Sequence, residues 1–151
     1  MVGDVAIEWG QARSQFRHLS GRVIHLKQGA ALLLAGYARG GDIAAVLAEV
    51  AQATGQGVVP FILAADCNIS HDDLSARAEL AALGARALPS PGPVTCFQGA
   101  GSCVDHLVAS DCLCAYVEDY RLITEVPFGP HAAFSFVIRR NPRAVMITRF
   151  W

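Results

Sequence analysis

Apolar and polar positions alternate over two early stretches of the chain, residues 22–26 and the more apolar 30–37. Alternation of this kind is typical of strands. The short loop between them contains Gly29, so the pair is predicted to form an antiparallel hairpin. The preceding residues, 1–21, are weakly patterned, and within them only Val5–Ile7 fits a short strand.

Two later stretches carry helix patterns. Asp42 is a good N-cap for the first helix, and Gly55 follows its last periodic residue. Ser70 and the carboxylate three residues later resemble a capping box, which predicts a helix over 71–83 that Gly84 closes. In the first helix, apolar residues recur at the i, i+3, i+4 and i+7 positions of one face: Ile43, Val46, Leu47 and Val50.

Between these predicted helices lies the apolar stretch 58–65, which ends abruptly in polar residues. A run of this length suits a strand that is covered on both faces. Because side chains alternate along a strand, Asp66 and Asn68 at its C-terminal end are predicted to share one side. A carboxylate and an amide so placed can bind a hard cation, or can position and activate a water. The alternative is a polar strand end followed by a helix cap.

Short strands and loops follow one another through the second half of the chain. Pro89–Pro93 reads as an irregular loop, and Gly99–Gly101 reads as a turn. Strands outnumber helices and often follow one another directly, which favours a mixed α/β sandwich over a regular βαβ fold. Neither type of glycine-rich phosphate loop is present, so nucleotide-binding folds lose support. Strands are predicted over 94–97, 103–109, 119–126 and 133–138.

Composition narrows the class of protein. A chain of 151 residues, 53% hydrophobic and 17% charged, suits one domain with a sizeable core and argues against disorder. The net charge of −1 provides no global field that would draw the chain to nucleic acid. No apolar run reaches the roughly 18 to 20 residues that span a bilayer, and the early charges Asp4, Glu8 and Arg13 are unlike a signal peptide.

Five cysteines, an odd number, favour reduced thiols and an intracellular setting. Cys112 and Cys114 form a C-x-C pair, which a strand would present on one face. A zinc site needs two further ligands, and the sequence offers no second close pair. We therefore interpret the cysteines as small buried hydrophobic residues rather than as a structural metal site.

Four polar features follow one another along the chain, each at a predicted strand end or beside a loop. They are Tyr37, Asp66-x-Asn68, Asp105 at the start of a strand, and His131 before the final strand. Functional groups commonly occupy such positions. Each feature alone is a weak signal, but their order and spacing are more specific.

This order resembles the C-terminal part of the endonuclease/exonuclease/phosphatase superfamily, which includes apurinic endonucleases, pancreatic-type DNases, inositol polyphosphate phosphatases and LINE-type retrotransposon endonucleases. The family's Asn-Val-Tyr-x-Pro strand end corresponds to Leu-Ala-Gly-Tyr-Ala at 34–38, and its Gly-Asp-Phe-Asn to Ala-Asp-Cys-Asn at 65–68. Its Thr-rich strand corresponds to Thr-Cys-Phe at 95–97, and its Ser-x-Ile-Asp-Tyr to Ser-Cys-Val-Asp-His at 102–106. The Ser-Asp-His before its last strand corresponds to Gly-Pro-His at 129–131, so the resemblance covers about residues 22–139.

The resemblance implies a partial four-layered, DNase-like α/β sandwich that lacks the family's N-terminal strands. By this resemblance, residues 1–151 form one partial domain, in which 1–21 are a weakly patterned lead-in and 140–151 are a basic tail. The implied activity is phosphodiester hydrolysis with Mg²⁺ or Mn²⁺, most plausibly by a nuclease of retroelement origin. The implied partner is nucleic acid, with DNA preferred over RNA, and phosphoinositides are an alternative substrate. The resemblance implies no membrane partner. Self-association is a further expectation.

The resemblance also implies roles for single residues. Asp66 would take a proton from the attacking water or orient it, and Asn68 would hold that water or a phosphate oxygen. His131 would contact the scissile phosphate and be oriented by Asp105, and Tyr37 would donate to a phosphate oxygen. Tyr37 suits a core or interface position equally well.

The chain also departs from the family pattern. The family's principal metal ligands are an Asn and a Glu on earlier strands, and the surroundings of Glu8 do not match them. The Asp that precedes the family's final His is Pro130 here. A second hypothesis follows: the chain is an inactive, truncated remnant that acts, if at all, as a binding or interaction module.

Overall fold

The computed structural model describes residues 31–126 and 129–139, together with the backbone of 22–25. Several predicted features lie outside these residues: the short strand at 5–7, Glu8, the hairpin loop around Gly29, and the tail 140–151. Within the described part, no helix is long and apolar enough to cross a membrane.

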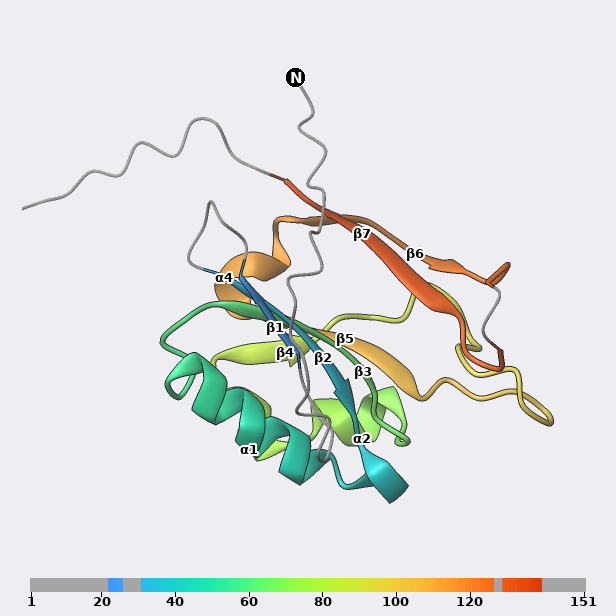
Figure 1. The fold of residues 1–151 in the computed structure, drawn as a ribbon, viewed down its shortest axis with the longest axis horizontal. Helices are drawn as coiled ribbons and strands as arrows, with labels where there is room; N and C mark the ends of the chain where they lie inside the picture. Colours follow the sequence, from blue (N-terminus) through green and yellow to red (C-terminus); the bar gives the residue numbers. More distant parts are fainter. Residues whose placement is uncertain (1–21, 26–30, 127–128, 140–151) are drawn as a thin grey trace, which may run out of the picture.

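A five-stranded sheet forms the centre of the molecule (Figure 1). Its first two strands pair antiparallel, which confirms the predicted hairpin. The second strand pairs in parallel with the third, and the remaining pairs are antiparallel. In spatial order the strands are β1 (Arg22–His25), β2 (Leu32–Tyr37), β3 (Phe61–Asp66), β5 (Asp105–Ser110) and β4 (Ala85–Ala87).

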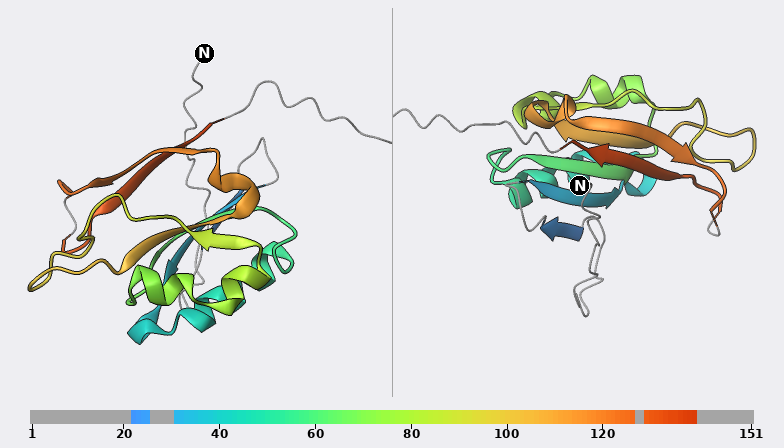
Figure 2. Two further views of the ribbon diagram at one scale, coloured as in Figure 1. Left: turned by 180° about the vertical axis from the view of Figure 1, so that it is seen from behind. Right: turned by 90° about the horizontal axis from the view of Figure 1, so that it is seen from above.

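The two faces of this sheet carry different layers (Figures 1 and 2). Helices α1 (Ile43–Thr54), α2 (His71–Ser75) and α3 (Ala78–Ala82) cover one face. A two-stranded antiparallel sheet, β6 (Val117–Ile123) with β7 (Ala133–Ile138), covers the other. Two single-turn helices, η1 (Arg39–Gly41) and α4 (Asp111–Cys114), complete the elements of the described residues. The predicted mixed α/β sandwich is therefore confirmed.

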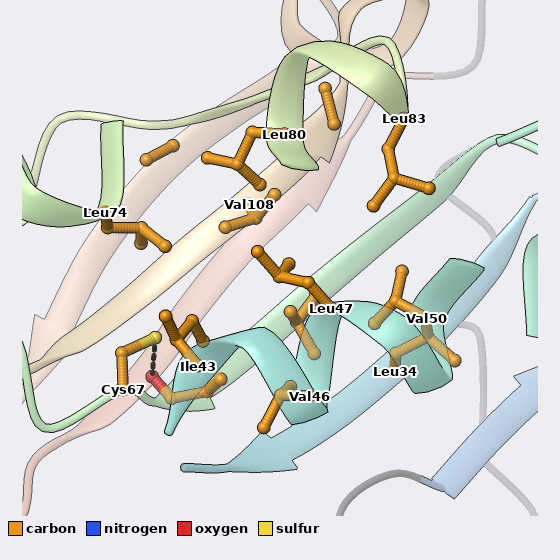
Figure 3. Packing of buried hydrophobic residues seen from close by; sticks show 14 of the residues in the cluster. Leu34, Ile43, Val46, Leu47, Val50, Cys67, Leu74, Leu80, Leu83 and Val108 are labelled. Carbon is orange, nitrogen blue, oxygen red and sulfur yellow. Dashed lines mark hydrogen bonds between the residues drawn. The ribbon is translucent and has the colours of Figure 1, made fainter. Parts of the chain in front are cut away.

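Strand β3 is covered on both faces, as the apolar run predicted. Phe61, Leu63 and Ala65 pack in the helix-side core, part of which Figure 3 shows. Ile62 and Ala64 pack in a second cluster beneath β6 and β7. By this alternation Asp66, the last residue of β3, falls on the face that carries the second sheet.

Helix α1 forms as its pattern predicted. The Asp42 carboxylate accepts a hydrogen bond from the Ala45 backbone N–H at 3.2 Å. Gly55 ends the helix in a left-handed conformation with φ of 62°. The four periodic apolar residues are all buried, and they face the sheet (Figure 3).

The predicted helix over 71–83 is wrong as one continuous element. Its cap is present, because the Ser70 hydroxyl accepts from the Asp73 N–H at 3.1 Å. The chain then becomes extended at Arg77, which separates α2 from α3. Leu74 and Leu80, six residues apart, would point about 120° away from each other around one helix. The break allows both to be buried in the same core.

Further strand predictions need correction. The stretch 94–97 forms only isolated bridges through Cys96, and the missed strand β4 immediately follows the glycine that closes α3. Cys112 and Cys114 lie on the helix α4 rather than on a strand, and Cys112 is exposed rather than buried. These elements are one to four residues long, so their periodicity is too short to reveal them.

Gly57 provides a test of the packing between the α1–β3 turn and α3. Its φ is +82°, and an added Cβ would lie 2.5 Å from the Leu83 carbonyl oxygen. Gly84 has a φ of +58° with nothing within 4 Å of such a Cβ. We expect Gly84→Ala to lower the free energy of unfolding by about 1–2 kcal/mol through conformation alone. Gly57→Ala should cost about 3 kcal/mol or more, because backbone must also move. Urea denaturation measures both, and equal losses would contradict this account.

Candidate functional site

Strand pairing brings two carboxylates together. Asp66 ends β3, Asp105 begins β5, and the two are direct partners in the antiparallel register. Side chains of directly paired residues project to the same face. Asp105 is 7% exposed, and Asp66 is partly buried. Two acidic groups therefore share a poorly solvated position at one end of the layer between the sheets.

His131 completes this cluster from the segment that leads into β7. Its Nδ1 lies 2.9 Å from Oδ2 and 3.1 Å from Oδ1 of Asp105. Its Nε2 lies 3.8 Å from Oδ2 of Asp66. The imidazole therefore lies between the two carboxylates. We call Asp66, Asp105 and His131 the acid–histidine cluster.

Backbone contacts hold this histidine in place. The Ala132 N–H donates to the Thr95 carbonyl, and the Phe97 N–H donates to the Pro130 carbonyl, each at 2.8 Å. His131 itself forms an isolated antiparallel bridge with Cys96. The segment 95–97 thus positions His131, although it forms no regular strand.

Thr95 is a positioning residue to which the sequence analysis assigned no role. It is fully buried, and its Oγ1 accepts from the N–H groups of Val104 at 3.1 Å and Asp105 at 3.0 Å. The hydroxyl thereby fixes the backbone that carries Asp105. No spacing rule signals such a contact, because it joins a loop residue to a strand nine or ten positions later.

The Asp105 carboxylate influences the ionisation of Asp66. Burial raises the pKa of Asp66 above its ordinary value, and the negative charge of Asp105 raises it further. The charge of His131 and hydrogen bonds from Asn68 act in the opposite direction. An acid pair of this kind favours binding a proton or a cation.

The neighbouring thiol is poorly suited to act as a nucleophile. Cys67 is fully buried on the helix side, and its Sγ lies 3.6 Å from the Ala65 carbonyl (Figure 3). Burial, followed by the charges of Asp66 and Asp105, raises the pKa of Cys67 to about 12. The group therefore stays a neutral thiol near pH 7.

Asn68 does not lie on the strand with Asp66, contrary to the alternation argument. Strand β3 ends at Asp66, and Asn68 has a left-handed φ of 52°. Its side-chain amide donates to the Ala38 carbonyl at 3.1 Å. Its backbone N–H donates to Asp66 Oδ1 at 3.2 Å. Asn68 thus contacts Asp66 of the acid–histidine cluster through its backbone N–H, and its side chain also acts to lower the pKa of Asp66.

Tyr37 ends β2 and is the parallel register partner of Asp66. Aligned residues on parallel strands face the same side, so Tyr37 and Asp66 share a face. Tyr37 is 47% exposed, so it is not a core residue, and its side chain makes no hydrogen bond within the described residues. Its hydroxyl is free to contact a ligand.

The acid–histidine cluster fits a divalent metal ion. One ligand atom from each of Asp66, Asp105 and His131 can be chosen so that all lie within 4.8 Å of one another. Carboxylate oxygens and imidazole nitrogen are common ligands for such ions. The mutual repulsion of the carboxylates also favours a cation here. The positions of the family's other metal ligands add no side chain to this set, because Pro130 has no side-chain ligand atom and Glu8 lies outside the described residues.

A scan against models of known protein families finds no match, and neither does a search among curated proteins. The fold does match a solved structure, the endonuclease domain of TRAS1, a telomere-specific non-LTR retrotransposon, with a TM-score of 0.60 and 18% sequence identity. The match covers 78% of this chain and 62% of that domain, so the chain spans less than two thirds of its structural neighbour. The chain therefore has an endonuclease-like α/β fold.

Proposed function

We propose that the chain hydrolyses phosphodiester bonds with a divalent metal ion, as a nuclease of the endonuclease/exonuclease/phosphatase type. The observation that carries this proposal is the acid–histidine cluster, in which Asp105 contacts His131 at 2.9 Å and Asp66 lies across from its other nitrogen at 3.8 Å. The endonuclease-like fold supports the same reaction class. We propose nucleic acid as the substrate, DNA ahead of RNA, and a retroelement origin.

Asp66 is the proposed base or orienting group for the attacking water. A catalytic base works best when its pKa lies near the working pH. Burial and the neighbouring Asp105 raise the pKa of Asp66 before a cation binds, and a bound cation would lower it again. The Asn68 N–H holds Oδ1, which leaves Oδ2 on the side of His131.

His131 is the proposed phosphate contact, with Asp105 as its orienting partner. An Nδ1–H donated to Asp105 fixes the ring and directs Nε2 away from that carboxylate. In the imidazolium form, Nε2–H donates to a phosphate oxygen, and the paired carboxylate stabilises the positive charge. Tyr37, exposed on the same face as Asp66, is the proposed second donor to phosphate.

The proposed reaction uses a divalent metal ion, which the acid–histidine cluster would hold. Asp66 and Asp105 would hold it, with His131 also within ligand distance. Mg²⁺ and Mn²⁺ commonly bind through one or two carboxylates together with water and substrate phosphate. When bound, such an ion supplies positive charge to the phosphate and lowers the pKa of a bound water.

Nicking of supercoiled plasmid tests the proposed function. The full chain should convert supercoiled to open-circular DNA with Mg²⁺ or Mn²⁺, and EDTA should abolish the conversion. The readout is the rate of band conversion on an agarose gel, with the far-ultraviolet circular dichroism spectrum as evidence of folding. A folded chain that nicks no DNA with either metal would contradict the proposal and favour the binding-module alternative.

A further inference from the structure

Phe97 is an exposed aromatic residue on the segment that positions His131 of the acid–histidine cluster. The residue is 50% exposed, whereas its neighbour Cys96 is buried. The Phe97 N–H bonds to the carbonyl of Pro130, the residue before His131. The ring therefore projects from backbone that is tied directly to the segment carrying His131.

Tyr37 presents a second exposed ring on another side of the cluster. Across the sheet, Tyr37 on β2 is followed by Asp66 on β3 and Asp105 on β5. The segment 95–97 bonds to the β5 side of this row through Thr95, so the backbone segments that carry Phe97 and Tyr37 lie on opposite sides of the Asp66–Asp105 pair. The two residues are sixty positions apart in the sequence.

The positively charged residue Arg39 lies close to Tyr37 in the sequence. Arg39 lies two residues further on, in η1, and is exposed. Within the described residues it makes no ion pair and no side-chain hydrogen bond. A guanidinium in this position suits a phosphate group. Aromatic rings with an adjacent cation are typical of surfaces that bind single-stranded nucleic acid.

We propose that Phe97 and the ring face of Tyr37 stack on the bases that flank the scissile phosphate of a single-stranded polynucleotide, with the Tyr37 hydroxyl still donating to that phosphate from the ring edge, while Arg39 contacts the backbone. The inference rests on the proposed function for the position of the phosphate. A nucleobase has a flat face that an exposed ring can cover, whereas an inositol phosphate has none. In a duplex that face is already stacked on neighbouring base pairs. Unpaired strands are therefore the ligand that this surface fits.

Binding of a fluorescein-labelled single-stranded DNA oligonucleotide, measured by anisotropy in EDTA, tests the inference without hydrolysis. Phe97→Ala should weaken binding about 5- to 150-fold, the range expected for one lost stacking contact. Phe97→Trp, which keeps an aromatic ring, should bind the oligonucleotide about as tightly as the unaltered chain does. Val137→Ala, a truncation at an equally exposed apolar residue on β7, should bind as the unaltered chain does.

An oligonucleotide of abasic sites supplies the chemical control, because it keeps the phosphates and lacks the bases. The unaltered chain should bind it more weakly than Phe97→Ala binds the base-containing strand, because the Tyr37 contact is lost as well, and Phe97→Ala should cause no further loss on the abasic strand. Undiminished binding of the base-containing strand by Phe97→Ala would overturn the inference, as would the absence of any binding by the unaltered chain. Stacking without metal-dependent cleavage of either the plasmid or the same single-stranded oligonucleotide would support this surface and count against the proposed hydrolysis alone.

Discussion

Replacing Asp66 with asparagine is expected to lower metal-dependent cleavage by about 10²- to 10⁴-fold, the contribution typical of a general base. Asparagine has the same shape as aspartate and its oxygen can still accept the 3.2 Å hydrogen bond from the Asn68 N–H. It cannot accept a proton from water, and it removes one of the two negative charges available to a cation. Single-turnover cleavage of a labelled oligonucleotide measures the loss.

The matched control is Asp119→Asn. Asp119 is exposed on β6 and has a left-handed φ of 49°, which asparagine tolerates. Asp119→Asn removes one negative charge, as Asp66→Asn does, but at a position outside the acid–histidine cluster. Because burial and Asp105 disfavour the ionised form of Asp66, Asp66→Asn should not lower the free energy of unfolding. Equal cleavage by the two variants would remove Asp66 from the mechanism.

Truncating Phe61 to alanine is expected to lower the free energy of unfolding by about 3–5 kcal/mol. Phe61 is fully buried at the start of β3 and packs in the core between the five-stranded sheet and the helices. The cost combines the lost apolar burial with the cavity that remains, and it is a large part of the roughly 5–15 kcal/mol that stabilises a typical domain. Equilibrium denaturation in urea measures it.

Phe97→Ala is the control for this prediction, because it removes the same side-chain atoms from a half-exposed position. Its expected cost is below about 1 kcal/mol, since little core contact is lost. A comparable loss in both variants would mean that the 95–101 loop is as important to stability as the core. A small loss in Phe61→Ala would mean that the helix layer closes around the cavity.

The sequence predicted the elements that have long, regular patterns. The i, i+3, i+4, i+7 spacing located α1, and β7 matches its predicted range of 133–138. The position of polar residues at the ends of apolar runs also indicated Asp66, Asp105 and His131, which the structure brings together. Their chemical roles remain proposals.

Features that depend on tertiary contacts were not predictable in this way. β4 is three residues long and forms only because β5 pairs with it. The predicted helix over 71–83 breaks at Arg77, and both Leu74 and Leu80 are then buried in one core, an arrangement that the capping signals did not reveal. The side chain of Asn68 turns toward Ala38 because the chain adopts a left-handed conformation immediately after β3.

The acid–histidine cluster draws its members from both sheets. Asp66 and Asp105 belong to the five-stranded sheet, whereas His131 enters with β7. Detachment of the β6–β7 ribbon would therefore carry the imidazole away while every strand pair of the larger sheet stayed intact. Such partial openings require less free energy than complete unfolding. The contact between His131 and the two carboxylates thus depends on the packing of the two layers. A chain can keep most of its secondary structure and still lose its candidate site.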